Sequence, residues 1–458
     1  MLPPKSLLLL FLSFCLLFLI VSIPLGNAAT GWTRTYGEVT RSETANWVIQ
    51  TSDGGYAMVG SAGAVYGQSD AFLVKTGASG EMQWSQTYGG EYSDSGNSVL
   101  QTSDGSYVVA GTKNEGSENG SEVWLFKTDS SGNMQWEQTF IDTWPGAGPY
   151  GFCVVQSRDG GYAIAADMYF EAADEVGGFS LIKTDSSGNP QWNRTYGQRA
   201  TFSKSSLVQT DDDGFALATA KAREGVRFGS DFWLIKTDSN GIMQWNRTYS
   251  DGLGDTAFSI VQTADNGYAL AGSRGPSESL ADQRHGDFML VKTDSTGNMQ
   301  WLKTYGGVDS ETAYSVVQTT DGGYIMAGYS LIEDKSNPAN QDDYNTNWVV
   351  KTDASGNTQW SKTYGNPDKW EIPNSIIQTT DGGYAFAGEI SDQSGDAPHD
   401  FWLVKTDANG EVSSETAGPS PTVPEFPLTG IVIMALVAIP VAAIVFKKRA
   451  GCLRIEKS

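Results

Sequence analysis

Residues Gln318–Gly328 read QTTDGGYIMAG, and Gln378–Gly388 read QTTDGGYAFAG, an almost unchanged copy sixty residues later. Five earlier stretches carry the same pattern, beginning at Gln50, Gln101, Gln156, Gln209 and Gln262. A W-x-x-T-[YF] segment also occurs seven times at intervals of 52 to 59 residues, beginning at Trp32, Trp84, Trp136, Trp192, Trp245, Trp301 and Trp360. Self-similarity at such a period indicates that each repeat is one structural unit.

Each unit contains four runs of strand length, rich in β-branched and aromatic residues and bounded by Gly, Asp, Asn and Ser. Seven units of four strands predict an all-β, seven-bladed β-propeller, with blades running SVVQT (strand A), GYIMAG (B), FWLVKTD (C) and MQWSQTYG (D). The last repeat has strand C at 400–407 but no strand D after it, while the chain supplies that piece early, as GWTRTYG at 31–37. We therefore expect the N-terminal strand to close the last blade.

The Asp-Gly-Gly-Tyr stretch joins strands A and B. The two residues after its Asp are Gly, Asn or Asp in nearly every repeat, which favours a two-residue type I′ hairpin with positive φ at both positions. Ser106 fits this turn poorly. The Asp would accept hydrogen bonds from turn amides. The alternative is a phosphate or metal loop, but Asp211–Asp213 lacks the alternating oxygen ligands of a calcium loop, and no metal site is predicted.

Three further repeated features have structural interpretations. The C-to-D connection TDSSGNMQW (128–136) resembles the Asp-boxes of sialidase-like propellers and the tryptophan-docking motifs of quinoprotein-type propellers, although its spacing fits neither. Its Trp is expected to pack between blades. The seven glutamines either form a polar ring or bond to backbone groups of a neighbouring blade, and the second is favoured. Cys153 stands where other repeats have Ser, so we expect a core-facing thiol.

The two ends have their own signals. Residues 1–29, with Lys5 and the apolar run Leu7–Ile20, predict a secretory signal peptide before the propeller domain at 30–413. A proline-rich linker at 414–427 precedes an apolar run at 428–446, long enough for one transmembrane helix, and a basic tail at 447–458. Basic residues stay in the cytoplasm, so the propeller is expected outside the cell, anchored in the cell membrane.

The order Pro-Glu-Phe (424–426), apolar span and basic cluster resembles the C-terminal sorting signals of archaeal surface proteins. That resemblance implies an archaeal envelope protein whose anchor is cleaved and replaced by a lipid, the alternative being a plain membrane anchor. The repeats themselves resemble the Trp-Thr-Tyr-Gly, Asp-Gly-Gly-Tyr and Lys-Thr-Asp repeats of prokaryotic surface proteins. This second resemblance implies a propeller of poorly defined function.

The sequence excludes several classes of function. Its formal charge of −23 makes nucleic acid an improbable partner. No Ser-His-Asp order, histidine metal cluster or nucleotide loop appears, so no cofactor and no catalytic residue is predicted. The two histidines, His285 and His399, are interpreted as surface residues. Carboxylate pairs for glycoside hydrolysis are defined by distance in space, so the sequence does not decide about them.

Binding is expected on the face formed by the B-to-C and D-to-A loops, which differ between repeats. Aromatic and acidic residues there suit stacking on sugar rings with hydrogen bonds to hydroxyls: Trp144, Tyr150, Tyr329, Tyr344, Trp370, Asp142, Asp342, Asp343 and Asp368. The alternative is that these rings fold under their own loops.

These features predict a cell-surface binding or adhesion module for a glycan or protein ligand. The alternatives are an extracellular carbohydrate-active enzyme, which the sequence favours less, and a structural component of the envelope. Sequons at Asn119, Asn193 and Asn246 make the protein a candidate glycoprotein, with Asn193 and Asn246 expected to be inaccessible beside the strand D tryptophans.

Overall fold

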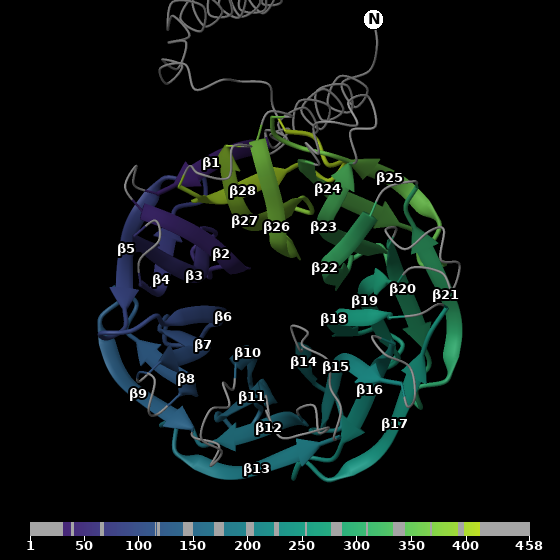
Figure 1. Cartoon of the computed structure of the whole chain (residues 1–458), viewed down its shortest axis with the longest axis horizontal. Coiled ribbons are helices and arrows are strands. Elements are labelled where there is room, and N and C mark those ends of the chain that lie inside the picture. Colours follow the sequence, from purple (N-terminus) through teal and green to yellow (C-terminus); the bar gives the residue numbers. More distant parts are fainter. Residues whose placement is uncertain are drawn as a thin grey trace, which may run out of the picture. The chain divides into compact units, whose positions relative to one another are not determined.

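A computed structural model describes residues 31–37, 41–64, 68–114, 116, 120–140, 150–168, 178–197, 206–223, 229–251, 254–275, 286–307, 310–332, 344–366, 369–392 and 398–412. These residues form seven four-stranded antiparallel sheets, arranged as blades around a central axis (Figure 1). The prediction of a seven-bladed β-propeller is therefore confirmed.

Each blade runs from an innermost strand A to an outermost strand D (Figure 1). In this order, blades 1 to 4 are β2 (Arg41–Gln50), β3 (Tyr56–Ala64), β4 (Ser69–Thr76), β5 (Met82–Tyr88); β6 (Ser95–Gln101), β7 (Tyr107–Asn114), β8 (Ser121–Thr128), β9 (Met134–Phe140); β10 (Tyr150–Gln156), β11 (Tyr162–Met168), β12 (Gly178–Thr184), β13 (Pro190–Tyr196); and β14 (Ser206–Gln209), β15 (Phe215–Ala222), β16 (Ser230–Thr237), β17 (Met243–Tyr249). Blades 5 to 7 are β18 (Thr256–Gln262), β19 (Tyr268–Arg274), β20 (Asp287–Thr293), β21 (Met299–Tyr305); β22 (Ser310–Gln318), β23 (Tyr324–Ile332), β24 (Tyr344–Thr352), β25 (Thr358–Lys362); and β26 (Lys369–Gln378), β27 (Tyr384–Asp392), β28 (Asp400–Thr406), β1 (Trp32–Tyr36).

Blade 7 is built from both ends of the propeller, as predicted. Strand β1 pairs antiparallel with β28, from Trp32 opposite Lys405 to Tyr36 opposite Phe401. The indole of Trp402 donates to the Thr33 hydroxyl at 2.9 Å across the same seam. The 28 strands of the described residues all lie within the compact unit that ends at Ser413, so the fragment 30–413 contains the whole closed ring.

The core lies between neighbouring blades. Strand B is apolar on both faces because both are covered, and Tyr56, Ala57, Met58 and Val59 are each at most 1% exposed. The repeat Trp on strand D leans onto the next blade, where Trp84 packs edge-on against Tyr107 with ring centroids 5.7 Å apart. The prediction that these tryptophans pack between blades is confirmed.

The Tyr that ends the W-x-x-T-Y segment forms a second link between blades. The Tyr88 hydroxyl donates to the Gly132 carbonyl of the next blade at 2.6 Å, and equivalent bonds run from Tyr36, Tyr196, Tyr249, Tyr305 and Tyr364. Blade 2 has Phe140 at this position, so its ring packs against the core between blades 2 and 3 without a hydroxyl to donate.

The A-to-B turn differs from the type I′ prediction. In blade 1 the Gly54 N–H donates to Thr51 O and the Thr51 N–H donates to Gly55 O, both at 2.9 Å. Only the first residue of the pair has positive φ, as at Gly54 (82°), Asp213 (64°) and Asn266 (61°). This is a type I turn followed by a single left-handed residue. Ser106 occupies the second position, which has ordinary φ, and is therefore unstrained.

The second glycine of the pair is needed for space instead. A Cβ at Gly55 would lie 2.1 Å from Thr76 O and 2.8 Å from Lys75 Nζ. The pair of glycines thus serves two purposes, left-handed backbone at the first and close approach of strand C at the second.

The glutamine at the end of strand A joins neighbouring blades. Its Oε1 accepts a backbone N–H from the A-to-B turn of the preceding blade, as in Ser52 N to Gln101 Oε1 at 2.8 Å. Five further links of this kind use Gln209, Gln262, Gln318, Gln378 and Gln50. The interpretation that these amides satisfy backbone groups of a neighbouring blade is confirmed for these six glutamines.

Candidate ligand-binding site

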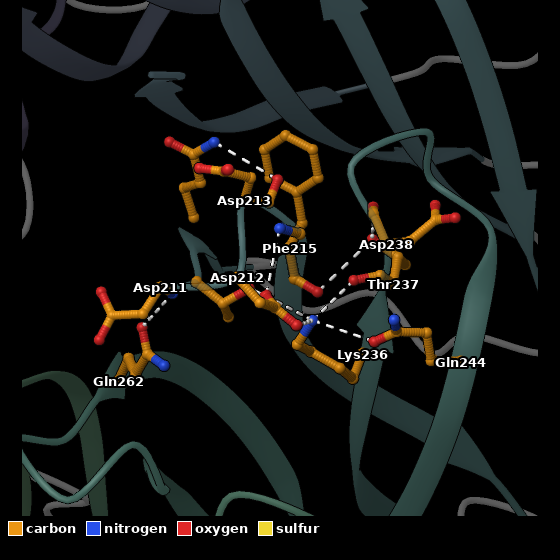
Figure 2. A network of polar contacts seen from close by, with 12 residues as sticks. Asp211, Asp212, Asp213, Phe215, Lys236, Thr237, Asp238, Gln244 and Gln262 are labelled. Atoms are coloured by element: carbon orange, nitrogen blue, oxygen red, sulfur yellow. Dashed lines mark hydrogen bonds and ion pairs between the residues drawn. The ribbon is translucent and has the colours of Figure 1, made fainter. Parts of the chain in front are cut away.

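The A-to-B and C-to-D turns lie on one face of the ring, which we call the constant face. Its most connected side chain is a lysine of strand C. Figure 2 shows the network in blade 4, where Lys236 Nζ contacts Asp212 Oδ2 at 2.8 Å, Gln244 Oε1 at 3.1 Å and Thr237 O at 2.8 Å. Every blade has the equivalent pair, which in the other six is Lys75–Asp53, Lys127–Asp104, Lys183–Asp159, Lys292–Asp265, Lys351–Asp321 and Lys405–Asp381.

These pairs hold the turn to strand C. Burial opposes ionisation of Asp53, but hydrogen bonds from Lys75, Thr51 and the Gly55 amide outweigh it and lower its pKa to about 2. The lysine is itself buried and its charge is matched by this carboxylate, so the network is a repeated structural feature. The predicted Asp bond to a turn amide is confirmed by Gly55 N to Asp53 Oδ1 at 3.0 Å. Sequence reasoning missed the lysine, although Lys-Thr recurs in all seven repeats.

The opposite face, formed by the B-to-C and D-to-A connections, is the variable face. Each innermost strand that is described over its full length has a β-bulge near the variable face. At the bulge, one residue of strand A has no partner in strand B. A bulge turns its extra residue away from the regular alternation. The bulge residues whose side chains are described lie on innermost strands around the axis: Asn46, Asn97, Phe258, Tyr314 and Asn374. In blade 3 the bulge residue is Phe152, whose side chain lies outside the described part.

Aromatic rings gather on one side of the axis, in blades 5 and 6. Phe258 packs edge-on against Tyr314 with centroids 5.3 Å apart, and Tyr314 lies 5.7 Å from Tyr329. Burial raises the pKa of Tyr314, and the neighbouring Tyr329 and Glu389 raise it further, so this phenol stays protonated and able to donate. All three rings are partly exposed.

A carboxylate and an imidazole lie beside these rings. Glu389 Oε2 accepts from the Thr44 hydroxyl at 2.7 Å and lies 3.4 Å from His399 Nδ1. The neighbouring Glu389 carboxylate raises the pKa of His399, partly offset by burial, and Asp400 adds to the rise. Glu389 and His399 belong to blade 7 and Thr44 to blade 1, so this group spans the seam where the ring closes.

Amide side chains occupy the other side of the axis. Asn46 Nδ2 donates to Gly96 O at 3.0 Å and to Asn97 Oδ1 at 3.2 Å, and Asn374 Nδ2 donates to Ala45 O at 2.9 Å. These bonds connect blades 7, 1 and 2. The axis therefore has an aromatic side and an amide side. We call Phe258, Tyr314, Tyr329, Glu389, His399, Thr44, Asn46 and Asn374 the axial site.

One more aromatic residue reaches the axis. Trp47, next to the bulge residue Asn46, packs against the core cluster of blades 1 and 2 and also against the cluster of blades 3 and 4. Strand A of blade 1 lies across the axis from blade 4 (Figure 1). The indole of Trp47 therefore extends across the axis, on the constant-face side of the bulge residues.

The structure brings only part of the predicted site together. Tyr329 belongs to the axial site, while Trp370 lies half-buried on β26 and is not one of its residues. Tyr150 and Tyr344 begin β10 and β24, but their side chains lie outside the described part. The predicted residues in the loops also lie outside it: Trp144, Asp142, Asp342, Asp343 and Asp368.

Sequence reasoning missed most of the axial site. His399 is not an isolated surface residue as expected, because it is 27% exposed and bound to Glu389; His285 lies outside the described residues. Tyr314 and Glu389 had a detectable signal, since each is a large or charged residue at a position where several other repeats have small polar ones. Within the described residues, no group of three or more His, Cys, Asp or Glu side chains suits a metal ion.

Cys153 and the sequons have clear outcomes. Cys153 is buried as predicted, its thiol pointing at Leu207 O, and burial raises its pKa to about 11.

Asn193 is exposed, so its predicted inaccessibility is wrong, because strand D is the outer edge of the blade. Asn246 is half-buried and accepts from the Trp233 indole at 3.1 Å. Asn119 lies outside the described residues.

The anchor prediction concerns residues beyond those described. No helix in the described ranges is long and apolar enough to cross a membrane, and residues 428–446 are not among them.

Comparison with known proteins gives a likeness of fold. No protein-family model matches the chain, and no curated protein matches it. Similar solved structures include the β-propeller domain of the Trilobed protease from Pyrococcus furiosus, at 9% identity over 87% of this chain and 99% of that one, with a TM-score of 0.44. A PL25 ulvan lyase is 11% identical over 82% and 96% (TM-score 0.48), and the Hadza microbial sialidase Hz136 is 11% identical over 75% and 74% (TM-score 0.41). At these identities the likenesses concern the fold alone.

Proposed function

We propose that this protein is an extracellular, membrane-anchored binding module that takes a sugar-containing ligand at the axial site. The observation that carries the proposal is the convergence of Tyr314, Tyr329 and Phe258 with Glu389 around the axis. Partly exposed rings offer flat apolar surfaces, and the carboxylate and amides offer hydrogen bonds to hydroxyls.

Comparison of the repeats supports a role in binding. Tyr314 occupies the bulge position that holds Asn in blades 1, 2 and 7, and Tyr329 occupies the position of Ser61 and Ser273. Blades with the small residues form the same sheets, so the fold does not require tyrosine at either place. Residues that depart from a repeat without serving the fold are expected at functional positions.

The place where the described propeller ends is compatible with this role. Val412, the last described residue, follows the C-to-D turn of blade 7 on the constant face, opposite the axial site. The predicted signal peptide and transmembrane segment complete the proposal of a surface-anchored protein.

A glycan array and calorimetry with fragment 30–413 test the proposal. Tyr314→Asn and Tyr329→Ser install residues that other blades already use, so both variants should fold. We expect each to weaken glycan binding about tenfold or more, without change in melting temperature. Tyr92→Ser is the matched control, because Tyr92 is 39% exposed and packs against Gly116 instead of the axis. Equal losses in the control, or unchanged binding in both axial variants, would place the site elsewhere.

A carbohydrate-active enzyme is the second candidate, favoured by one observation. Glu389 and His399 form a carboxylate–imidazole pair beside the protonated Tyr314, and such groups can transfer protons to a glycosidic oxygen. Incubation with polysaccharides distinguishes the two functions. Release of reducing ends or unsaturated products, abolished in Glu389→Gln, would establish catalysis; binding without product supports the module.

A further inference from the structure

Trp47 differs from the residue that the other repeats have at the same position of strand A. The equivalent residue is Ser in blades 2, 4, 5, 6 and 7 and Cys in blade 3: Ser98, Ser206, Ser259, Ser315, Ser375 and Cys153. Blade 1 alone places a large ring there.

The small residue has a structural task that Trp47 cannot perform. Each Ser hydroxyl accepts a backbone N–H from strand A of the next blade, as in Val154 N to Ser98 at 3.3 Å and Val316 N to Ser259 at 3.1 Å. The same bond links blades 4 to 5, 6 to 7 and 7 to 1. An indole has a donor but no acceptor, so Trp47 cannot form this bond. The described residues of blades 1 and 2 are linked here by Asn46 instead.

Part of the Trp47 indole stays accessible beside the axial site. Trp47 is partly exposed and extends across the axis to the cluster of blades 3 and 4, while its neighbour Asn46 belongs to the axial site. In the described blades with serine at this position, the sheets close without such a ring. A bulky, partly exposed aromatic residue in place of a hydrogen-bonding serine is the kind of departure from a repeat that is expected at a functional position.

We propose that Trp47 is a ligand-stacking and specificity-determining residue of the axial site, which receives the apolar face of a neutral pyranose ring. The proposal rests on the proposed function above. Glu389 places a carboxylate at the same site and the chain is strongly acidic, which disfavours polyanionic sugars. Asn46 Oδ1 accepts no hydrogen bond within the described residues, so it can accept one from a sugar hydroxyl.

Two substitutions separate a binding role from a packing role. Trp47→Ser restores the residue of five other blades and gives strand A of blade 2 a new acceptor, so it should fold, with a melting temperature lowered by the packing that the ring loses. Trp47→Phe keeps an aromatic ring. The probes are the methyl glycosides of glucose, galactose, mannose and N-acetylglucosamine, with methyl glucuronide as the acidic comparison.

Indole N–H resonances of 15N-tryptophan-labelled fragment 30–413 give a direct readout. The Trp47 signal is assigned by its absence in Trp47→Phe. We expect a neutral glycoside to shift this signal. Trp47→Ser should lower the affinity for that glycoside about tenfold, and Trp47→Phe should retain most of the affinity. Methyl glucuronide should leave the signal unchanged.

The outcomes distinguish the inference from the proposed function. If Tyr329→Ser abolishes binding while Trp47→Ser changes neither affinity nor the response to glycoside, Trp47 is a packing residue and this inference is wrong. If a glycoside binds but no axial variant weakens it, the proposed site itself is wrong. Preferential binding of the glucuronide, or no response of the Trp47 signal to any of the five probes, overturns the assignment of a neutral pyranose.

Discussion

The backbone N–H of Thr380 donates to Gln50 Oε1 at 2.9 Å, joining the last blade to the first across 330 positions of the chain. The same bond links most neighbouring blades, so the closing seam uses the chemistry of the other interfaces. Closure therefore depends on a repeated side chain as well as on the pairing of β1 with β28.

Removing the glutamine link should weaken the ring. Gln50→Leu loses a hydrogen bond to a backbone N–H, and we expect about 1 kcal/mol lower free energy of unfolding in urea. Gln156 is the matched control, because it is exposed and accepts no turn N–H within the described residues. Gln156→Leu should therefore change stability little. An equal loss in both variants would show that the glutamines act through something other than this bond.

The missing tyrosine hydroxyl of blade 2 can be restored. Phe140 stands where six other blades have tyrosines that donate to a glycine carbonyl of the next blade. Phe140→Tyr should gain up to about 1 kcal/mol through a bond to Gly188 O, and Tyr88→Phe should lose a similar amount. Urea unfolding of both variants measures these changes in the free energy of unfolding. Destabilisation by Phe140→Tyr would mean that the hydroxyl is buried without a partner.

Two left-handed glycines should respond differently to substitution. A Cβ at Gly132 (φ 83°) would lie 2.9 Å from the Trp84 ring, whereas a Cβ at Gly160 (φ 84°) meets nothing within 4 Å. Gly160→Asn should cost less than about 1 kcal/mol, because Asn266 already holds this turn position at φ 61°. Gly132→Asn should cost clearly more, since it also displaces the tryptophan. Equal thermal unfolding temperatures would contradict the role of the ring contact.

Acid should weaken all blades together. Burial opposes the ionisation of Asp159, but hydrogen bonds from Lys183, Ser157 and the Gly161 amide lower its pKa to about 2, below the unfolded value near 3.8. The stabilisation is therefore complete above about pH 4 and is lost as the pH falls through 2. Urea midpoints should drop over this window, and Asp159→Asn should flatten the drop. An identical pH dependence in that variant would exclude the pair as a cause.

The stability of the seam between blades 7 and 1 should fall at high pH instead of low pH. The Glu389 carboxylate, 3.4 Å away, raises the pKa of His399 above its usual value of 6.5. Stability from this pair is therefore full below that value and is lost as the pH rises through the folded pKa. His399→Gln should lower the melting temperature at about pH 5.5 and have little effect at about pH 9. A difference that does not vary with pH would show that His399 acts by packing alone.

Much of the fold could be predicted because its information is local and repeated. Spacing of the tryptophans and the four strand-like runs predicted the blades, and the displaced GWTRTYG predicted the pairing of Trp32 with Lys405. The prediction of a type I′ turn was wrong because Gly55 is needed for the close approach of Thr76 O and not for positive φ. This contact lies between strands, so turn statistics do not contain it. The Lys75–Asp53 pair was missed for the same reason.

The candidate site could be predicted only as a face. Alternating strand direction placed the variable loops on one side, and Tyr329 was found there. Its partners were not, because Tyr314, Glu389 and Thr44 lie in three different blades and meet only when the ring closes.

The sequence by itself determined the number of blades, their phase and the way the ring closes, since each repeat carries its own strands and turns. Only the tertiary structure decided which departures from the repeat meet at the axis. The bulges of the innermost strands and the circular closure bring together residues as distant as Trp47 and Leu207 with its cluster, or Thr44 and Glu389. Proximity in a closed ring depends on the angle between blades, which no single repeat encodes.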